Sequence, residues 1–265
     1  MFKKILSPVD FSVEAVEYTH YANKLASKLN ACLFLIHSIE GDYRRYGVDN
    51  KADRNTVLQA VQQKFEIWRK TYHFEQVTPI ITFGEITECI AEQAEIHSID
   101  LVVMFTRGLD EEEWLGTNTT KVAKIAPCPV LSIKSIKTEP NFKKILLPID
   151  PKLTVQGLST YALEFVKYMQ AEIELIYVGE EDENSRQVLQ KYNNLYQSSG
   201  IKVEFNFVDR EDSVAETIIS YSEKNNFDLI IMATHARMGI KALILGSVTE
   251  YCINNATIPV LTLRA

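Results

Sequence analysis

The sequence repeats itself about half-way along its 265 residues. Residues 2–10 read FKKILSPVD and residues 142–150 read FKKILLPID, identical at seven of nine positions. Three later motif pairs keep the same order: DLVVM at 100–104 with DLIIM at 228–232, GTNT at 116–119 with GSVT at 246–249, and PVL at 129–131 with PVL at 259–261. An internal repeat of this kind predicts two copies of one structural unit, so a single fold must suit both halves.

The duplication also predicts where the domains begin and end. We place the first domain at residues 1–136 and the second at 141–265. Between them, residues 135–141 read SIKTEPN, a polar segment with a proline that is typical of a linker. The chain length agrees, because a domain usually takes about 100–200 residues.

Each half alternates short apolar runs with segments of helical periodicity. Strands are expected near residues 4–9, 31–36, 77–81, 101–105 and 130–133, and again near 144–149, 173–178, 202–207, 229–233 and 259–263. In the first half, helices are expected over residues 13–29, around Val57 to Trp68, from Ile86 and over residues 117–125. This alternation predicts an α/β fold in which each domain is a five-stranded, parallel, doubly wound sheet with about four helices.

Composition excludes several classes of function. With 28 Lys and Arg against 35 Asp and Glu, the net charge is −7, which disfavours general binding to nucleic acid or anionic membranes. The longest apolar runs have five or six residues, far below the ~20 needed to cross a bilayer. Four cysteines without a C-x-x-C motif indicate free thiols in a cytoplasmic protein.

Ligands of open parallel sheets bind beyond the carboxyl ends of the strands, so we examine the residues found there. Asp10 and Asp150 follow the first strands of the two halves, and Ser38 and Val178 follow the second strands. Further along, Gly116-Thr117 and Gly246-Ser247 each open a short helix, where free N–H groups favour an anion. These residues also have structural explanations. The aspartates could cap the following helices, the glycine pairs could form tight turns, and His235, in the loop after the fourth strand of the second half, could be a loop histidine with no partner.

These motifs, found twice in the same order, resemble the universal stress protein family in its tandem form. The marks are K-K-I-L-x-P-x-D in both halves, Phe11-Ser12, Thr234-His235, LGSV at 245–248 and the closing PVL. The resemblance covers nearly the whole chain. It implies two Rossmann-like domains of the adenine nucleotide alpha hydrolase-like type and a cytoplasmic, stress-response regulatory protein.

The second half resembles the loop pattern of the family's ATP-binding members, which is Gly, two residues, Gly, nine residues, then Gly-Ser or Gly-Thr. It has this spacing, but alanine replaces both leading glycines. The resemblance implies that Asp150 and Val178 meet adenine and Ala233 the ribose. The phosphates would be surrounded by Ala236, Gly246, Ser247 and Val248, and His235 and Arg237 belong to the same loop. Alanine Cβ atoms narrow such a site, since glycine allows a closer approach.

The first half departs further from this pattern. Its loop is two residues shorter, Phe105 stands at the first glycine, and residues 110–113 read DEEE. These carboxylates either repel a triphosphate or form a solvated loop tip. We therefore expect a degenerate equivalent site formed by Asp10, Ser38, Gly108, Gly116 and Thr117, with nucleotide bound only in the second half.

Three functions remain open. The first is a regulatory protein that binds ATP or AMP, with Mg²⁺ only alongside ATP; the second is a ligand-free scaffold that acts by dimerisation and protein contacts. The third, slow ATP hydrolysis, is weakest, because the chain lacks H-E-x-x-H, G-x-S-x-G and an intact Walker sequence and shows no metal-ligand spacing. The resemblance also implies that strands 130–133 and 259–263 pair within the chain, which covers an exposed edge and leaves homodimerisation open.

Overall fold

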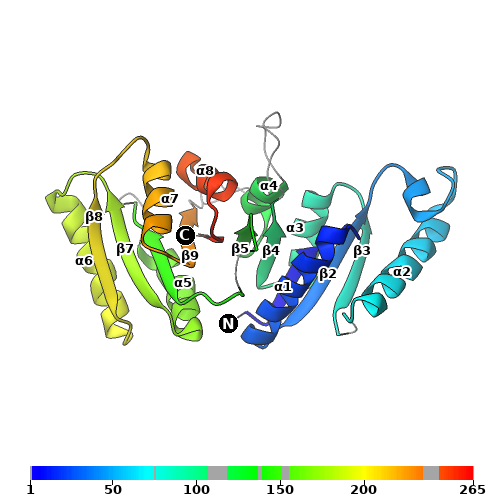
Figure 1. The fold of residues 1–265 in the computed structure, drawn as a ribbon, viewed down its shortest axis with the longest axis horizontal. Helices are drawn as coiled ribbons and strands as arrows, with labels where there is room; N and C mark the ends of the chain where they lie inside the picture. Colours follow the sequence, from blue (N-terminus) through cyan, green and yellow to red (C-terminus); the bar gives the residue numbers. More distant parts are fainter. Residues whose placement is uncertain are drawn as a thin grey trace. The chain divides into compact units, whose positions relative to one another are not determined.

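A computed structural model describes residues 2–74, 76–106, 118–136, 139–150, 155–234 and 245–264 (Figure 1). The strands of the first repeat are β1 (Lys4–Pro8), β2 (Cys32–Ile39), β3 (Thr78–Phe83), β4 (Leu101–Phe105) and β5 (Val130–Ile133). Its helices are α1 (Val13–Leu29), the 3-10 helix η1 (Tyr43–Tyr46), α2 (Arg54–Thr71), α3 (Ile86–Ile96) and α4 (Asn118–Ile125). Strand and helix alternate as the sequence predicts.

The second repeat has the same order of elements. Its strands are β6 (Lys144–Pro148), β7 (Glu172–Val178), β8 (Val203–Val208), β9 (Leu229–Thr234) and β10 (Val260–Arg264). Its helices are α5 (Val155–Met169), α6 (Glu183–Ser198), α7 (Val214–Lys224) and α8 (Ser247–Asn255). None of the described helices is long and apolar enough to span a membrane.

The chain divides into two compact units, the first ending at Val103 and the second beginning at Met104. In the first unit the strand order is β3-β2-β1-β4, and every pair is parallel. Consecutive residues of β1 and β4 are buried, which is the pattern of parallel strands covered on both faces.

In the second unit the strand order is β5-β10-β9-β6-β7-β8. The pairs within the second repeat are parallel, whereas β10 pairs antiparallel with β5, bringing Leu261 opposite Leu131. The predicted pairing of the two final strands is thus confirmed. It also explains why β5 and α4 belong to the second compact unit although they come from the first repeat.

The duplicated motifs at the amino ends of the strands have a structural cause. Asp100 accepts hydrogen bonds from the backbone N–H groups of Lys3 and Lys4, at 2.8 and 2.9 Å. In the second repeat Asp228 accepts from Lys143 and Lys144, both at 2.9 Å. The aspartate of each D-L-[VI]-[VI]-M motif therefore fixes the start of the strand in each K-K-I-L motif, which gives both motifs a structural role.

One strand is longer than predicted. We expected the second strand to end at residue 36, but β2 continues to Ile39, so Ser38 lies inside the strand and not after it. The polar side chains of this extension are buried and satisfied. His37 Nδ1 donates to Val9 O at 2.7 Å, and Ser38 Oγ donates to Gly84 O. Sequence periodicity ended the strand too early because it treats a polar residue as exposed.

Candidate functional site

Three neighbouring strands of the second repeat bring candidate residues to one edge of the sheet. β6 lies between β9 and β7, with Ile145 opposite Leu229 on one side and Ile173 on the other. The carboxyl ends of these strands carry Ala233, Asp150 and Val178, each half-buried. The structure therefore places the predicted adenine and ribose contacts next to one another at the edge where parallel sheets bind ligands.

The helix that follows this edge begins without a capping side chain. Gly246 is the N-cap of α8, whereas α6 and α7 are capped by Asp182 and Ser213, whose side chains accept backbone hydrogen bonds. Among the described residues no side chain takes this role at α8, so its first N–H groups keep their capacity for an anion. Ser247 and Val248 form the first turn, with Ser247 exposed.

The lack of a side chain at Gly246 leaves the N-terminus of α8 accessible, whereas the backbone conformation at this position is an ordinary one. Its φ of −64° and ψ of 148° suit any residue, so the turn itself does not require glycine. A Cβ at position 246 would meet no atom of the described residues within 4 Å. A substitution here therefore changes access to the helix terminus with little strain in the fold.

Part of the candidate site lies outside the described residues. This holds for His235, Ala236 and Arg237 of the second repeat and for Gly108, Gly116 and Thr117 of the first. Within the described ranges, no three His, Cys, Asp or Glu side chains are grouped as metal ligands.

In the first repeat, Asp10 braces a helix. Its Oδ1 accepts from the backbone N–H of Ser12 at 3.0 Å and from Ser12 Oγ at 2.6 Å. Ser12 in turn caps α1 by accepting from the N–H of Ala15 at 3.2 Å. The alternative that Asp10 serves the following helix is thus correct, but the N-cap itself is Ser12, two residues later. Asp10 orients that Ser12 side chain.

Aromatic side chains pack beside Asp10. Phe11, at φ 61°, places its ring centroid 4.5 Å from that of His37. The same ring meets Phe65 and Trp68 edge-on, at 5.5 and 5.9 Å. The Oγ of Ser38 is engaged by the backbone, as described above. From the sequence we did not predict that Phe11 packs against the aromatic side chains of other elements. Its position directly after Asp10, at the end of the first strand, was the signal that could have indicated this.

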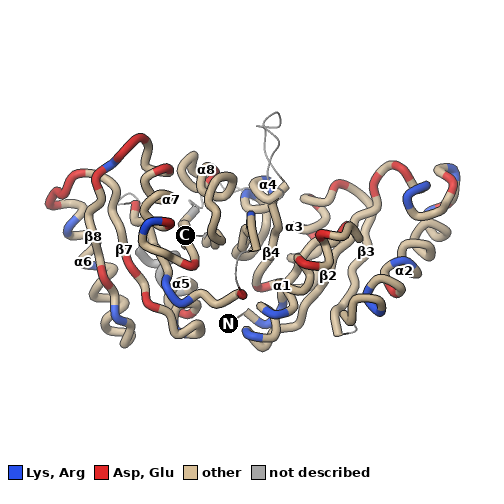
Figure 2. Tube along the Cα trace, viewed as in Figure 1, with Lys and Arg blue, Asp and Glu red and all other residues tan. Residues whose placement is uncertain are grey.

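The edge that carries the second-repeat site is acidic. Figure 2 shows acidic residues in the two loops that follow β7 and β8. Exposed carboxylates occupy these loops: Glu180, Glu181, Asp182, Asp209, Glu211 and Asp212. Three have structural roles: Asp182 caps α6, Glu181 pairs with Arg186 at 2.7 Å, and Glu211 Oε2 accepts from Ser220 Oγ at 3.3 Å. From the sequence we compared the charge of only two loops, the acidic one at residues 110–113 and its counterpart before Gly246, and so missed the charge after β7 and β8.

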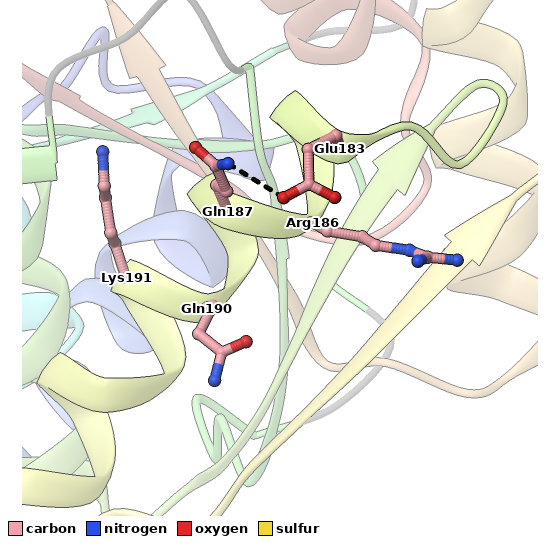
Figure 3. Close-up of a pocket in the computed structure, with 5 residues that line it drawn as sticks. All are labelled: Glu183, Arg186, Gln187, Gln190 and Lys191. Carbon is pink, nitrogen blue, oxygen red and sulfur yellow. Dashed lines mark hydrogen bonds between the residues drawn. The ribbon is translucent and has the colours of Figure 1, made fainter.

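A surface hollow on α6 has a different character. Figure 3 shows its side chains along the outer face of that helix: Glu183, Arg186, Gln187, Gln190 and Lys191. Gln187 Nε2 donates to Glu183 Oε1 at 2.9 Å, one turn away. Side chains of both charges on one face of a single helix are the ordinary solvated face of an amphipathic helix.

The fold and this site define a class: an α/β protein with two doubly wound repeats and a candidate ligand site at a strand edge. The model of the universal stress protein family matches residues 1–134 and again residues 141–264. The chain therefore belongs to the universal stress protein family, in its tandem form.

Individual relatives agree with this assignment. Universal stress protein MJ0531 of Methanocaldococcus jannaschii is 28% identical over 142 residues, which are 46% of this chain and 82% of the relative. Universal stress protein Slr1230 of Synechocystis is 23% identical over 217 residues, 80% of this chain and 69% of the relative. The crystal structure of a universal stress protein from Archaeoglobus fulgidus has a TM-score of 0.76 at 17% identity and covers 98% of both chains, which shows the common fold.

Proposed function

We propose that the second repeat binds an adenine nucleotide, ATP or AMP, and that the protein is a stress-response regulator whose state depends on this ligand. The observation that carries the proposal is the N-terminus of α8, which begins after Gly246 and is capped by no side chain of the described residues. It belongs to the repeat whose neighbouring strands end in Asp150, Val178 and Ala233. A helix terminus of this kind favours a phosphate group.

The proposal gives each described residue one part of the ligand. Asp150 and the backbone of Val178 would hold the base, and Ala233 would lie by the ribose. The backbone N–H groups of Ser247 and Val248 would face the phosphates, where Gly246 adds no Cβ that hinders the approach. Ala236, His235 and Arg237 complete the proposed site, and Mg²⁺ would accompany ATP alone. We assign no catalytic residue.

The proposal is tested by nucleotide content and by calorimetry. Protein purified without added nucleotide is denatured and the released small molecules are separated by ion exchange; ATP and AMP are then titrated into nucleotide-free protein. Asp150→Ala and Gly246→Val should each weaken binding by about tenfold or more, the effect of losing a hydrogen bond to a charged group or blocking close approach.

The duplication supplies a matched control. Asp10→Ala removes the equivalent carboxylate of the first repeat, which braces Ser12 and takes no part in the proposed site. This variant should bind like the wild type. No released nucleotide and no heat at millimolar ATP would reject the proposal and favour the ligand-free scaffold.

A further inference from the structure

A hollow of about 520 Å³ lies on the first repeat, where the segment after β1, the 3-10 helix η1 and α2 come together. Its lining combines aromatic rings with two cations: Phe11, Tyr46, Trp68, Tyr72, Arg45 and Lys64. None of the described residues that line it is acidic, although the chain as a whole has a net charge of −7. A volume of this size and an aromatic lining suit a small molecule.

Neighbouring side chains hold the aromatic rings of this hollow in place. The ring centroid of Phe11 lies 4.5 Å from that of His37 and 5.9 Å from that of Trp68. The hydroxyl of Tyr46 lies 2.8 Å from Nε2 of the same histidine, and the ring centroids of Tyr72 and Trp68 are 5.7 Å apart. Rings held in this way lose little conformational freedom on binding, so the hollow is preorganised for a planar apolar group.

The two cations have no carboxylate partner within the described ranges. The guanidinium of Arg45 donates to the backbone carbonyl of Glu40 at 2.7 Å, and its Cζ lies 4.9 Å from the ring centroid of Tyr46. Lys64 Nζ lies 5.4 Å from the ring centroid of Phe11 and 5.7 Å from that of Tyr46. Carbonyl oxygens and ring faces attract a cation but carry no net charge, so the positive charge at the hollow is not neutralised.

Two carboxylates close to these cations in sequence pair with other residues. Asp42 accepts from Nε and Nη2 of Arg44, at 2.8 and 2.9 Å. Glu66 pairs with Arg69 at 2.8 Å. The hollow therefore joins an apolar, aromatic wall to two cations that these acids leave unpaired, which is the complement of an organic anion.

We propose that this hollow binds a small organic anion, a planar apolar ring that carries a carboxylate or phosphate group. The ring lies against the aromatic walls, and the acidic group faces Lys64 Nζ and the guanidinium of Arg45. The duplicated fold does not require these features, because Pro151 follows the aspartate of the second repeat where Phe11 follows that of the first. The inference is independent of the proposed function, which concerns the second repeat.

The test is calorimetry with 2-naphthoate, compared with neutral 2-naphthalenemethanol and with acetate. The naphthoate should bind more tightly than either, because it alone has both ring and charge, and added salt should weaken its binding. Arg45→Gln combined with Lys64→Gln should weaken naphthoate binding by about tenfold and leave the alcohol within about twofold of the wild type. Tyr72→Ala should weaken the acid and the alcohol alike, by about fivefold, through the loss of one ring contact.

A matched control removes the same charges from the hollow on α6. Arg186→Gln combined with Lys191→Gln should bind naphthoate like the wild type. The position of the ligand is read from the indole N–H signal of Trp68 in NMR spectra of Trp114→Phe, which retains a single tryptophan; this signal should shift when naphthoate is added. Gly246→Val should bind naphthoate normally, because it alters the proposed nucleotide site alone.

Four results would overturn the inference and leave the proposed function standing. No heat with naphthoate at millimolar concentration means that the hollow binds no such anion. Equal affinity for the acid and the alcohol indicates an apolar surface only, and equal weakening by the two double variants indicates an effect of net charge only. An unchanged Trp68 signal places the bound naphthoate elsewhere on the protein.

Discussion

At the scale of the residue, His37 shows how a polar side chain becomes part of the core. It is 5% exposed; Nδ1 donates to Val9 O, and Nε2 lies 2.8 Å from the hydroxyl of Tyr46. Because the carbonyl can only accept, Nδ1 carries the proton and the neutral ring accepts from Tyr46. Burial outweighs the other influences and lowers the pKa of His37 below its usual 6.5.

This lowered pKa predicts a dependence of stability on pH. Between the pKa of His37 in the folded protein and 6.5, the unfolded chain binds a proton that the folded chain does not, so stability falls as the pH falls through this window. Thermal unfolding from pH 8 to pH 5 should show a steeper loss below pH 6.5 for the wild type than for His37→Gln, which does not titrate. Parallel curves for the two proteins would contradict the prediction; above pH 7 their difference should stay constant.

At the scale of the element, the pairing of β5 with β10 joins strands from the two repeats. Val260 is 1% exposed, opposite Ser132 on β5 and Ile230 on β9, and Thr262 Oγ1 donates to Val130 O at 3.1 Å. Nearby, Lys124 of α4 pairs with Glu250 of α8 at 3.1 Å. The half-exposed ion pair contributes little, so the buried strands are the stronger link.

Val260→Lys should break this link, because it buries an unpaired ammonium group. We expect a loss of about 3 kcal/mol or more in the free energy of unfolding. Hydrogen exchange should also accelerate at residues 130–133, although the substitution lies far away in sequence. The matched control is Ile67→Lys, at a side chain 59% exposed, which should change neither quantity. Unchanged exchange of β5 in Val260→Lys would mean that its protection has another source.

At the scale of the whole molecule, periodicity and repetition predicted the elements, because both report on packing. The pairing of the final strands came instead from the resemblance to the family. The same logic explains the misses. Ser38 was placed after β2 because burial of a polar side chain depends on a distant acceptor, Gly84 O. Phe11 was overlooked because its surroundings come from elements far apart in the chain. Spacing located the strand ends of the candidate site, and the acidic residues that follow strands 173–178 and 202–207 were readable there as well.

That charge leads to a prediction for the ligand. The chain carries a net charge of −7, and exposed carboxylates follow both β7 and β8 at the carboxyl edge of the second repeat. Like charges repel, and ATP without a metal carries more negative charge than either AMP or ATP with Mg²⁺. ATP should therefore bind about tenfold more weakly in EDTA than with Mg²⁺, and added salt should strengthen the metal-free binding by screening the repulsion. AMP should respond little to either change.

Two exposed aspartates in the loop after β8 allow a test of whether the acidic loops cause the weaker binding of metal-free ATP. The double variant Asp209→Asn, Asp212→Asn removes two negative charges. It should reduce the ratio between the ATP affinity with Mg²⁺ and the ATP affinity in EDTA by about threefold, because interactions between exposed charges are weak. The control is Glu92→Gln with Glu95→Gln, which removes the same charge from exposed positions of α3 in the first unit. Calorimetry of all three proteins at low and high salt measures both effects. If both double variants reduce this affinity ratio equally, the net charge of the protein alone is responsible. If neither variant reduces it, the acidic loops do not reach the phosphates, and Mg²⁺ acts by coordination.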